Sequence, residues 1–203
     1  MPLDGYRRVC ARIAGVLLVL AAVPSAGGRL FSVASDAVRI GWIYALCSFT
    51  ASVMLMLALA FLGVRVFSAE EEKWPAACIT AAVALLLRAG AVVWQILQTE
   101  ITWKTQIPTL VILGFSTVWL CLLATLSAGV CDFPGIFRLL LPLLPGAVFL
   151  AGFLFGLVPF LASLGKTDGF SLAAAGDALR LLCLLLCGAA AVLVGITCRE
   201  DCD

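Results

Sequence analysis

The chain has 203 residues, of which 64% are hydrophobic and 12% are charged, and its mean hydropathy is +1.16. In a soluble globular domain about a quarter of the residues are charged, so this composition excludes a soluble domain. The net charge of +1 leaves no basic face for a nucleic-acid partner. We therefore expect one integral membrane domain that covers residues 1–203.

Six apolar runs follow one another along the chain, and each predicts a spanning helix. They are residues 13–28, 40–64, 74–99, 105–131, 139–165 and 181–198, and only the third contains a charged residue. A bilayer core needs about 20 helical residues, which the middle four runs exceed. The runs are continuous rather than alternating, which favours helices over a closed barrel. The predicted fold is an all-α, polytopic transmembrane helix bundle.

The first run is the shortest, with 16 uncharged residues between Arg12 and Arg29. Basic residues before it and Pro24-Ser25-Ala26 near its end are also typical of a secretory signal peptide. Pro24 fits the small residue of a cleavage site poorly, and Arg12 and Arg29 can lengthen the helix by extending to the interfaces. We expect a retained helix and six spans; cleavage would leave five.

Lysine and arginine in the connections predict the orientation. Seven lie on the side of the two termini and five on the other side. The positive-inside rule then places both the N- and the C-terminus in the cytoplasm. We expect a multi-pass protein of the cell membrane.

Small residues at helical spacing indicate where helices contact one another in lipid. The fifth run contains one G-x-x-x-G pair, and the last run repeats a small residue at every fourth position. The predicted contact residues are Gly152, Gly156, Cys183, Cys187, Ala191 and Gly195.

Prolines and cysteines add two expectations. Pro142 and Pro145 predict that the regular helix of the fifth run begins near Pro145, after an irregular segment at residues 139–144. The nine cysteines show no spacing of a disulfide framework. Two thiols without histidine or acidic neighbours are poor metal ligands, so neither a metal nor a cofactor is predicted.

Arg88 is the charged residue inside the third run, and a charge there costs about 2.5–3.5 kcal/mol on insertion scales. Helical spacing places it on a stripe of small or amide-bearing residues and puts large apolar residues on the opposite side. The stripe is Ala77, Ala81, Ala84, Arg88, Ala91 and Gln95. Arg88 is therefore predicted to face the bundle interior.

Two interpretations of Arg88 remain open, because no run contains an acidic residue at the same depth. In the first, the guanidinium binds an anionic or dipolar solute in a polar cavity. The candidate ligand-binding residues are Arg88, Gln95, Thr80, Ser116 and Thr117, with Ser48, Thr50 and Ser52 as further lining residues. In the second, Arg88 binds backbone carbonyls at a helix break, or reaches Asp177 or Glu100. Asp177 and Arg180 are expected to pair with each other.

Catalysis is not expected. The chain has no histidine, which a serine rhomboid-type dyad or a histidine-ligated metalloprotease requires. Aspartyl chemistry would need two acids at membrane depth, and no base is available to activate a thiol.

Two function classes then remain, with the lipid bilayer as a partner of both. One is solute transport, alone or as the substrate-binding membrane subunit of a larger transporter, with other subunits and a small anionic or dipolar solute as partners. The length and the six-span layout are similar to those of the vitamin-binding S components of energy-coupling-factor transporters, which implies such a subunit. The other class is a non-catalytic scaffold, assembly or sensor protein that acts through partner helices. A polar cavity beside Arg88 would favour the first class, and a filled core the second.

Overall fold

The computed structural model describes residues 2–68, 73–99, 114, 135–164 and 172–199, and these ranges contain helices but no strand. The helices are α1 (Pro2–Leu30), α2 (Val33–Arg39), α3 (Trp42–Ser68), α4 (Lys73–Thr99), α6 (Gly135–Leu164) and α7 (Leu172–Arg199). Five of them, α1, α3, α4, α6 and α7, are long and apolar enough to cross a membrane. The predicted all-α membrane bundle is confirmed. The predicted run at residues 105–131 lies outside the described residues.

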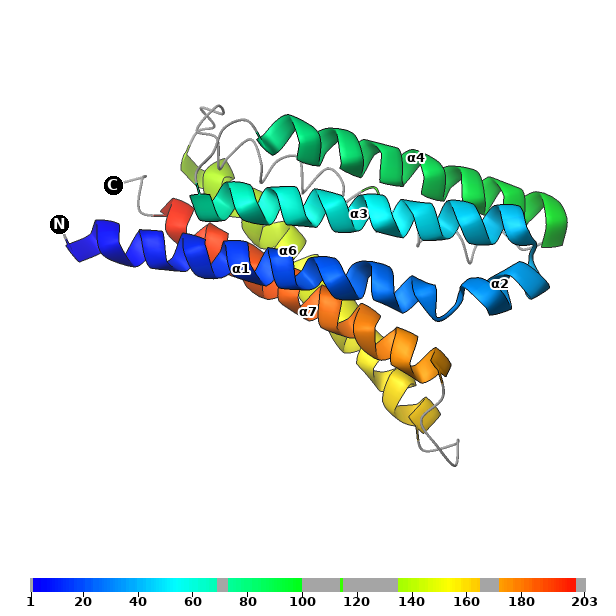
Figure 1. Ribbon diagram of the computed structural model, residues 1–203. Helices are drawn as coiled ribbons and strands as arrows, with labels where there is room; N and C mark the ends of the chain where they lie inside the picture. Colours follow the sequence, from blue (N-terminus) through cyan, green and yellow to red (C-terminus); the bar gives the residue numbers. More distant parts are fainter. Residues whose placement is uncertain (1, 69–72, 100–113, 115–134, 165–171, 200–203) are drawn as a thin grey trace.

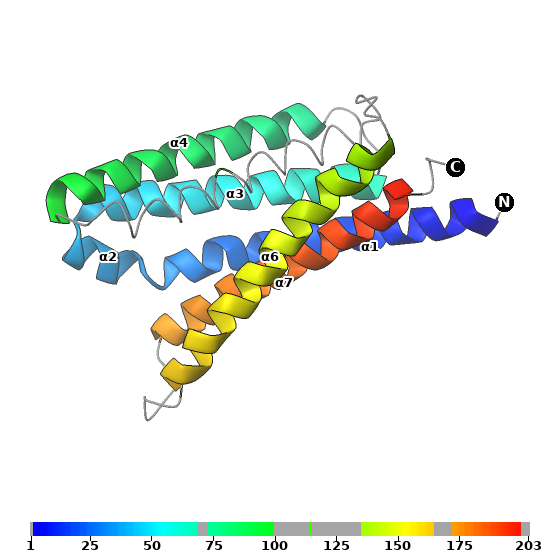
Figure 2. The same ribbon diagram turned by 180° about the vertical axis from the view of Figure 1, so that it is seen from behind.

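The spanning helices form a row with α1 at its centre (Figure 1). On one side α1 contacts α3, which contacts α4; on the other side α1 contacts α7, which contacts α6. The α6–α7 pair diverges from the α3–α4 pair in both views (Figures 1 and 2). The row therefore consists of two groups of helices that meet along α1.

The ends of the bundle can be named by what lies there. The first turn of α1 and the last turn of α7 lie at the same end, which we call the terminal end (Figures 1 and 2). The short helix α2 lies at the opposite end, between α1 and α3. We call this the α2 end. Gly41 makes the turn from α2 into α3 with φ +119°, a backbone conformation that other residues rarely adopt.

The first apolar run forms a longer helix than its uncharged stretch predicts. The span covers Arg8–Leu30, because the helix includes the arginines that flank the run. It also continues through Pro24, which is buried. Ala14 and Leu18 have no exposed surface and belong to the main apolar core. The first run is therefore a central spanning helix of this bundle.

The expectation for the prolines of the fifth run was wrong. The helix α6 is continuous from Gly135, so residues 139–144 are helical and Pro142 and Pro145 lie inside it. Each proline removes one backbone hydrogen bond and its ring crowds the carbonyl group four residues earlier, but its fixed φ is compatible with a helix. Helices in membrane proteins tolerate such a loss, because local adjustment and neighbouring helices compensate for it.

Two glycine pairs bring helix backbones into direct contact. Between α1 and α3, a Cβ built on Gly63 would lie 2.7 Å from the carbonyl oxygen of Gly15, and the reverse distance is also 2.7 Å. Between α1 and α7, a Cβ built on Gly28 or on Gly176 would lie 2.9 Å from the carbonyl oxygen of the other glycine. Small residues permit this close approach, as expected for helix association in lipid.

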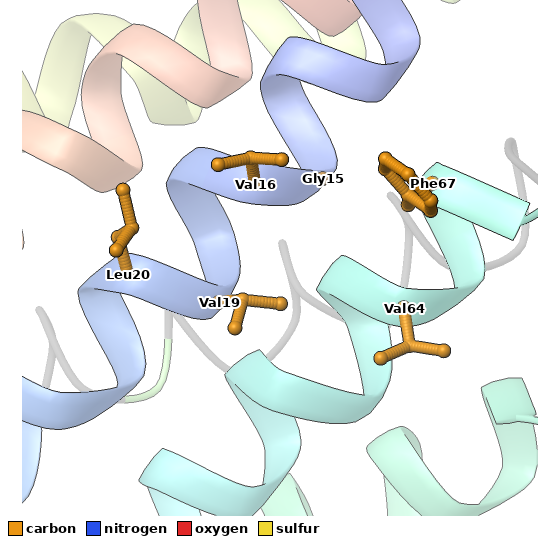
Figure 3. Close-up of a pocket in the computed structure, with 6 residues that line it drawn as sticks. All are labelled: Gly15, Val16, Val19, Leu20, Val64 and Phe67. Atoms are coloured by element: carbon orange, nitrogen blue, oxygen red, sulfur yellow. The ribbon is translucent and has the colours of Figure 1, made fainter.

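An apolar groove of about 280 Å³ lies beside the α1–α3 crossing (Figure 3). Its walls are Val16, Val19 and Leu20 of α1 and Val64 and Phe67 of α3. Val16, Val19, Leu20, Val64 and Phe67 are all exposed, as side chains on a lipid-facing surface would be. The described residues of the groove offer no polar side chain to a solute, so it is not the candidate site.

The predicted orientation of α4 is confirmed. The residues Ala77, Ala81, Ala84, Ala91 and Gln95 of the Arg88 stripe are buried. On the opposite side, Ile79, Leu86 and Leu97 are exposed. The helix thus turns its small residues toward α3 and its large apolar residues outward, which places Arg88 inside the bundle.

Candidate functional site

A cavity of about 550 Å³ lies between the two groups of helices, and residues of all five spanning helices line it. Among the described residues, the charged ones in its lining are Arg29 of α1, Arg88 of α4, and Asp177 and Arg180 of α7. Ligand sites in proteins typically enclose about 300–1,000 Å³, so this cavity is large enough for a small organic molecule.

The three arginines differ in their ionic partners. Arg29 pairs with Asp36 of α2, with 3.5 Å between Nη1 and Oδ2. Arg180 pairs with Asp177, as predicted, with 3.8 Å between Nη1 and Oδ1. In the described part of the chain, Arg88 has neutral partners. Its Nη1 donates a hydrogen bond to the hydroxyl of Ser48, and the Tyr44 side chain lies nearby.

The arrangement of α3 explains why these hydroxyls meet Arg88. Tyr44 and Ser48 lie one turn apart on the face of α3 that packs against α4, and both are buried. Arg29 and Arg180 are close enough to act on Arg88 electrostatically. The guanidinium groups of three different helices thus share one region. Asp36 of α2 and Asp177 of α7 supply carboxylates to Arg29 and Arg180, and among the described residues no carboxylate pairs with Arg88.

Most of the remaining described residues in the lining are apolar. They extend from the arginines toward the middle of the bundle along three helices, with Leu55 and Leu59 on α3, Phe149 on α6, and Leu184 and Cys187 on α7. Ser25 and Ser52 add hydroxyls on the arginine side. The cavity therefore has a charged half toward the α2 end, where Pro159, Phe160 and Leu181 also line it, and an apolar half toward the bundle centre.

The predicted ligand-binding residues lie in different places. Arg88 lines the cavity. Thr80 and Gln95 lie on α4 but are not lining residues: the Thr80 hydroxyl donates to the carbonyl oxygens of Ala76 and Ala77, at 2.7 and 3.1 Å, and Gln95 is buried. Ser116 and Thr117 lie outside the described residues. Of the further predicted lining residues, Ser52 lines the cavity, Ser48 holds Arg88, and Thr50 is exposed.

Four predicted packing residues lie at the cavity wall. Gly152 and Gly156 of α6 face α7: a Cβ on Gly156 would lie 2.8 Å from Leu181 Cδ2, and one on Gly152 would lie 3.8 Å from Leu184 Cδ1. Cys183 and Cys187 line the cavity from α7 as free thiols.

The other two predicted packing residues lie beyond the cavity. Ala191 is buried against α6, where its Cβ would meet a Cβ built on Gly146 at 3.1 Å. Gly195 is buried near the end of α7.

Arg29 and Arg180 were not among the predicted site residues. Both border apolar runs in the sequence, and we interpreted them as residues of connections. They lie in the cavity because α1 and α7 are helical beyond the uncharged runs, as far as Leu30 and back to Leu172. The signal in the sequence is that both arginines belong to the five basic residues predicted to lie on the side of the membrane opposite the termini.

Comparisons with protein-family models, with curated proteins and with solved structures found no match to this chain. The fold and the site therefore define the class: a polytopic helical membrane protein with an arginine-lined cavity between its helices.

Proposed function

We propose that the protein binds a small anionic solute inside the membrane, either as a transporter or as the substrate-binding membrane subunit of a transporter. The observation that supports this most is the cavity of about 550 Å³ beside Arg88. A non-catalytic scaffold would use the same arginine as a packing contact in a filled core. The open volume at this position favours the solute.

The chemistry of Arg88 supports the same proposal. An arginine stays charged in proteins and offers five donors in a planar fork, which suits a carboxylate or a phosphate. Ser48 and Tyr44 offer hydroxyl oxygens but no negative charge. An anionic solute in the cavity would supply that charge in a region of low dielectric constant, where a charge-assisted hydrogen bond is strong. The proposal involves binding and movement of a solute rather than catalysis.

The test is thermal stabilisation of the purified protein by a panel of monocarboxylates, dicarboxylates, inorganic phosphate and sulfate. We expect Arg88→Leu to keep or raise the stability of the unliganded protein, because it removes a buried charge. The same change should weaken binding of the active anion by about 10- to 150-fold, since a hydrogen bond to a charged group contributes about 1.5–3 kcal/mol.

Arg12→Leu is the matched control, because Arg12 is an exposed arginine near the terminal end of α1. It should leave binding unchanged. If no anion in the panel stabilises the wild-type protein, or if both variants lose binding equally, the proposal is wrong.

We further propose that both termini are cytoplasmic, in the cell membrane. The shared terminal end means that the two reporters must agree (Figure 1). We expect fusions of a cytoplasmic reporter before residue 7 and after residue 203 both to be active, and a fusion in the segment between α2 and α3, at Gly41, to be inactive. The charged half of the cavity would then face away from the cytoplasm, which suits capture of a solute from outside. If the reporter at Gly41 is active and both terminal reporters are inactive, the orientation is the reverse of the one proposed.

A further inference from the structure

We infer that the solute is an amphipathic monoanion, with one carboxylate-like head group at Arg88 and an apolar body in the inner half of the cavity. This inference rests on the proposed function and names its substrate class. It comes from two independent observations, the charge balance of the lining and the distribution of its apolar residues.

The charge balance gives the head group. The cavity lining and the ionic partners of its arginines include three cations and two carboxylates among the described residues, because Asp36 neutralises Arg29 and Asp177 neutralises Arg180. One positive charge remains, on Arg88. A monoanion balances this charge, whereas a dianion would bring one negative charge that nothing in the described lining offsets.

The distribution of apolar residues indicates that the part of the solute beyond the head group is apolar. From Arg180 to Cys187, α7 rises about 10 Å, and from Ser52 to Leu59, α3 rises by the same amount. Along both stretches the inner residues of the lining are apolar, and Phe149 of α6 joins them. A polar solute would have to bury its hydroxyl or amide groups there without hydrogen bonds, which costs about 1–3 kcal/mol per group in proteins. An alkyl or aromatic body gains free energy at the same place.

Exposure of the lining residues gives the orientation of the solute. The side chains of Asp177 and Arg180 are 58% and 59% exposed, so the charged half of the cavity opens at the protein surface. Cys187 and Leu59, in the apolar half, are buried. The head group at Arg88 therefore lies on the side of the opening, and the body points toward the bundle centre.

A chain-length series tests the apolar body. Butyrate, hexanoate and octanoate are titrated onto the protein in lipid nanodiscs, with empty nanodiscs subtracted and free aqueous concentrations measured. We expect the affinity to rise about fourfold per added methylene, which corresponds to about 0.8 kcal/mol per buried CH₂. Octanol and inorganic phosphate should bind weakly, since octanol lacks the anionic head group and phosphate lacks the apolar body. Arg88→Leu should abolish the difference between octanoate and octanol.

A second variant tests the charge balance. Asp177→Asn leaves Arg180 without its carboxylate, so the cavity gains a positive charge. Octyl phosphate, measured at a pH where it is a dianion, should then gain about two- to fivefold in affinity relative to octanoate, as expected for a partly exposed charge pair. Asp4→Asn, at the terminal end of α1, is the control and should leave the ratio unchanged.

The outcomes separate this inference from the proposed function. If phosphate or sulfate binds the wild type as tightly as octanoate, or if affinity does not depend on chain length, the amphipathic class is wrong while anion binding stands. If octanol binds as tightly as octanoate, the head-group assignment is wrong. If no anion binds at all, the proposed function itself fails.

Discussion

Gly63→Ala is expected to lower the free energy of unfolding by about 1–3 kcal/mol, the usual cost of forcing a methyl group into a packed contact. A Cβ on Gly63 would lie 2.7 Å from the Gly15 carbonyl oxygen and 2.9 Å from the Val19 backbone nitrogen. Backbone atoms cannot rotate away as a flexible side chain can, so α1 and α3 would have to separate. Unfolding in a detergent and denaturant series measures the effect.

Gly90→Ala provides the matched control for this change. Gly90 lies on the exposed side of α4, and a Cβ there would meet nothing within 4 Å. The substitution should leave the unfolding midpoint unchanged or raise it slightly, because alanine favours the helix more than glycine does. Equal losses for Gly63→Ala and Gly90→Ala would mean that the two helices do not cross at Gly15 and Gly63.

Gly152→Leu is expected to weaken octanoate binding by roughly 5- to 150-fold, which corresponds to about 1–3 kcal/mol of overpacking when the ligand is present. The first atom of the new side chain is tolerated, since a Cβ would meet only Leu184 Cδ1, at the ordinary contact distance of 3.8 Å. The rest of the leucine would extend into the cavity that Gly152 lines. The stability of the unliganded protein should stay near that of the wild type, because the added group fills open volume.

Nanodisc titration and thermal unfolding, performed on the same preparations, separate binding from folding. Gly90→Leu adds the same side chain on the outer side of α4, so its octanoate affinity should equal that of the wild type. A Gly152→Leu protein that binds octanoate normally would show that the cavity beside α6 is not the site.

Much of the fold could be predicted from hydropathy, because a bilayer selects for helix length and apolarity, both of which the sequence shows directly. The side of α4 that packs against the bundle was predictable too. The helical repeat places Ala77, Ala81 and Ala84 on one side of the helix and Ile79 and Leu86 on the other. The order of the helices in the row was not. It depends on pairs such as Gly15 with Gly63 and Gly28 with Gly176, which lie 48 and 148 positions apart in the chain and have no local signal of pairing.

The candidate site could be predicted only in part. Arg88 was found because a charge within an apolar run is conspicuous. Arg29 and Arg180 border their runs, and the sequence alone does not show how far a helix extends past the last apolar residue. Ser48 was a candidate lining residue, but its hydrogen bond to Arg88 depends on the relative rotation of α3 and α4. Thr80 was predicted for its polarity, yet its hydroxyl is bonded to its own helix, a common alternative for threonine.

The row arrangement has a consequence for the width of the cavity. Among the described helices, the α3–α4 pair and the α6–α7 pair are joined mainly through α1, whose contact with α7 includes the Gly28–Gly176 crossing. The absence of side chains at this crossing sets how closely α1 approaches α7, and therefore how far apart the two walls of the cavity stand. A larger residue at either glycine would thus alter the space around Arg88 from a distance, without entering the cavity.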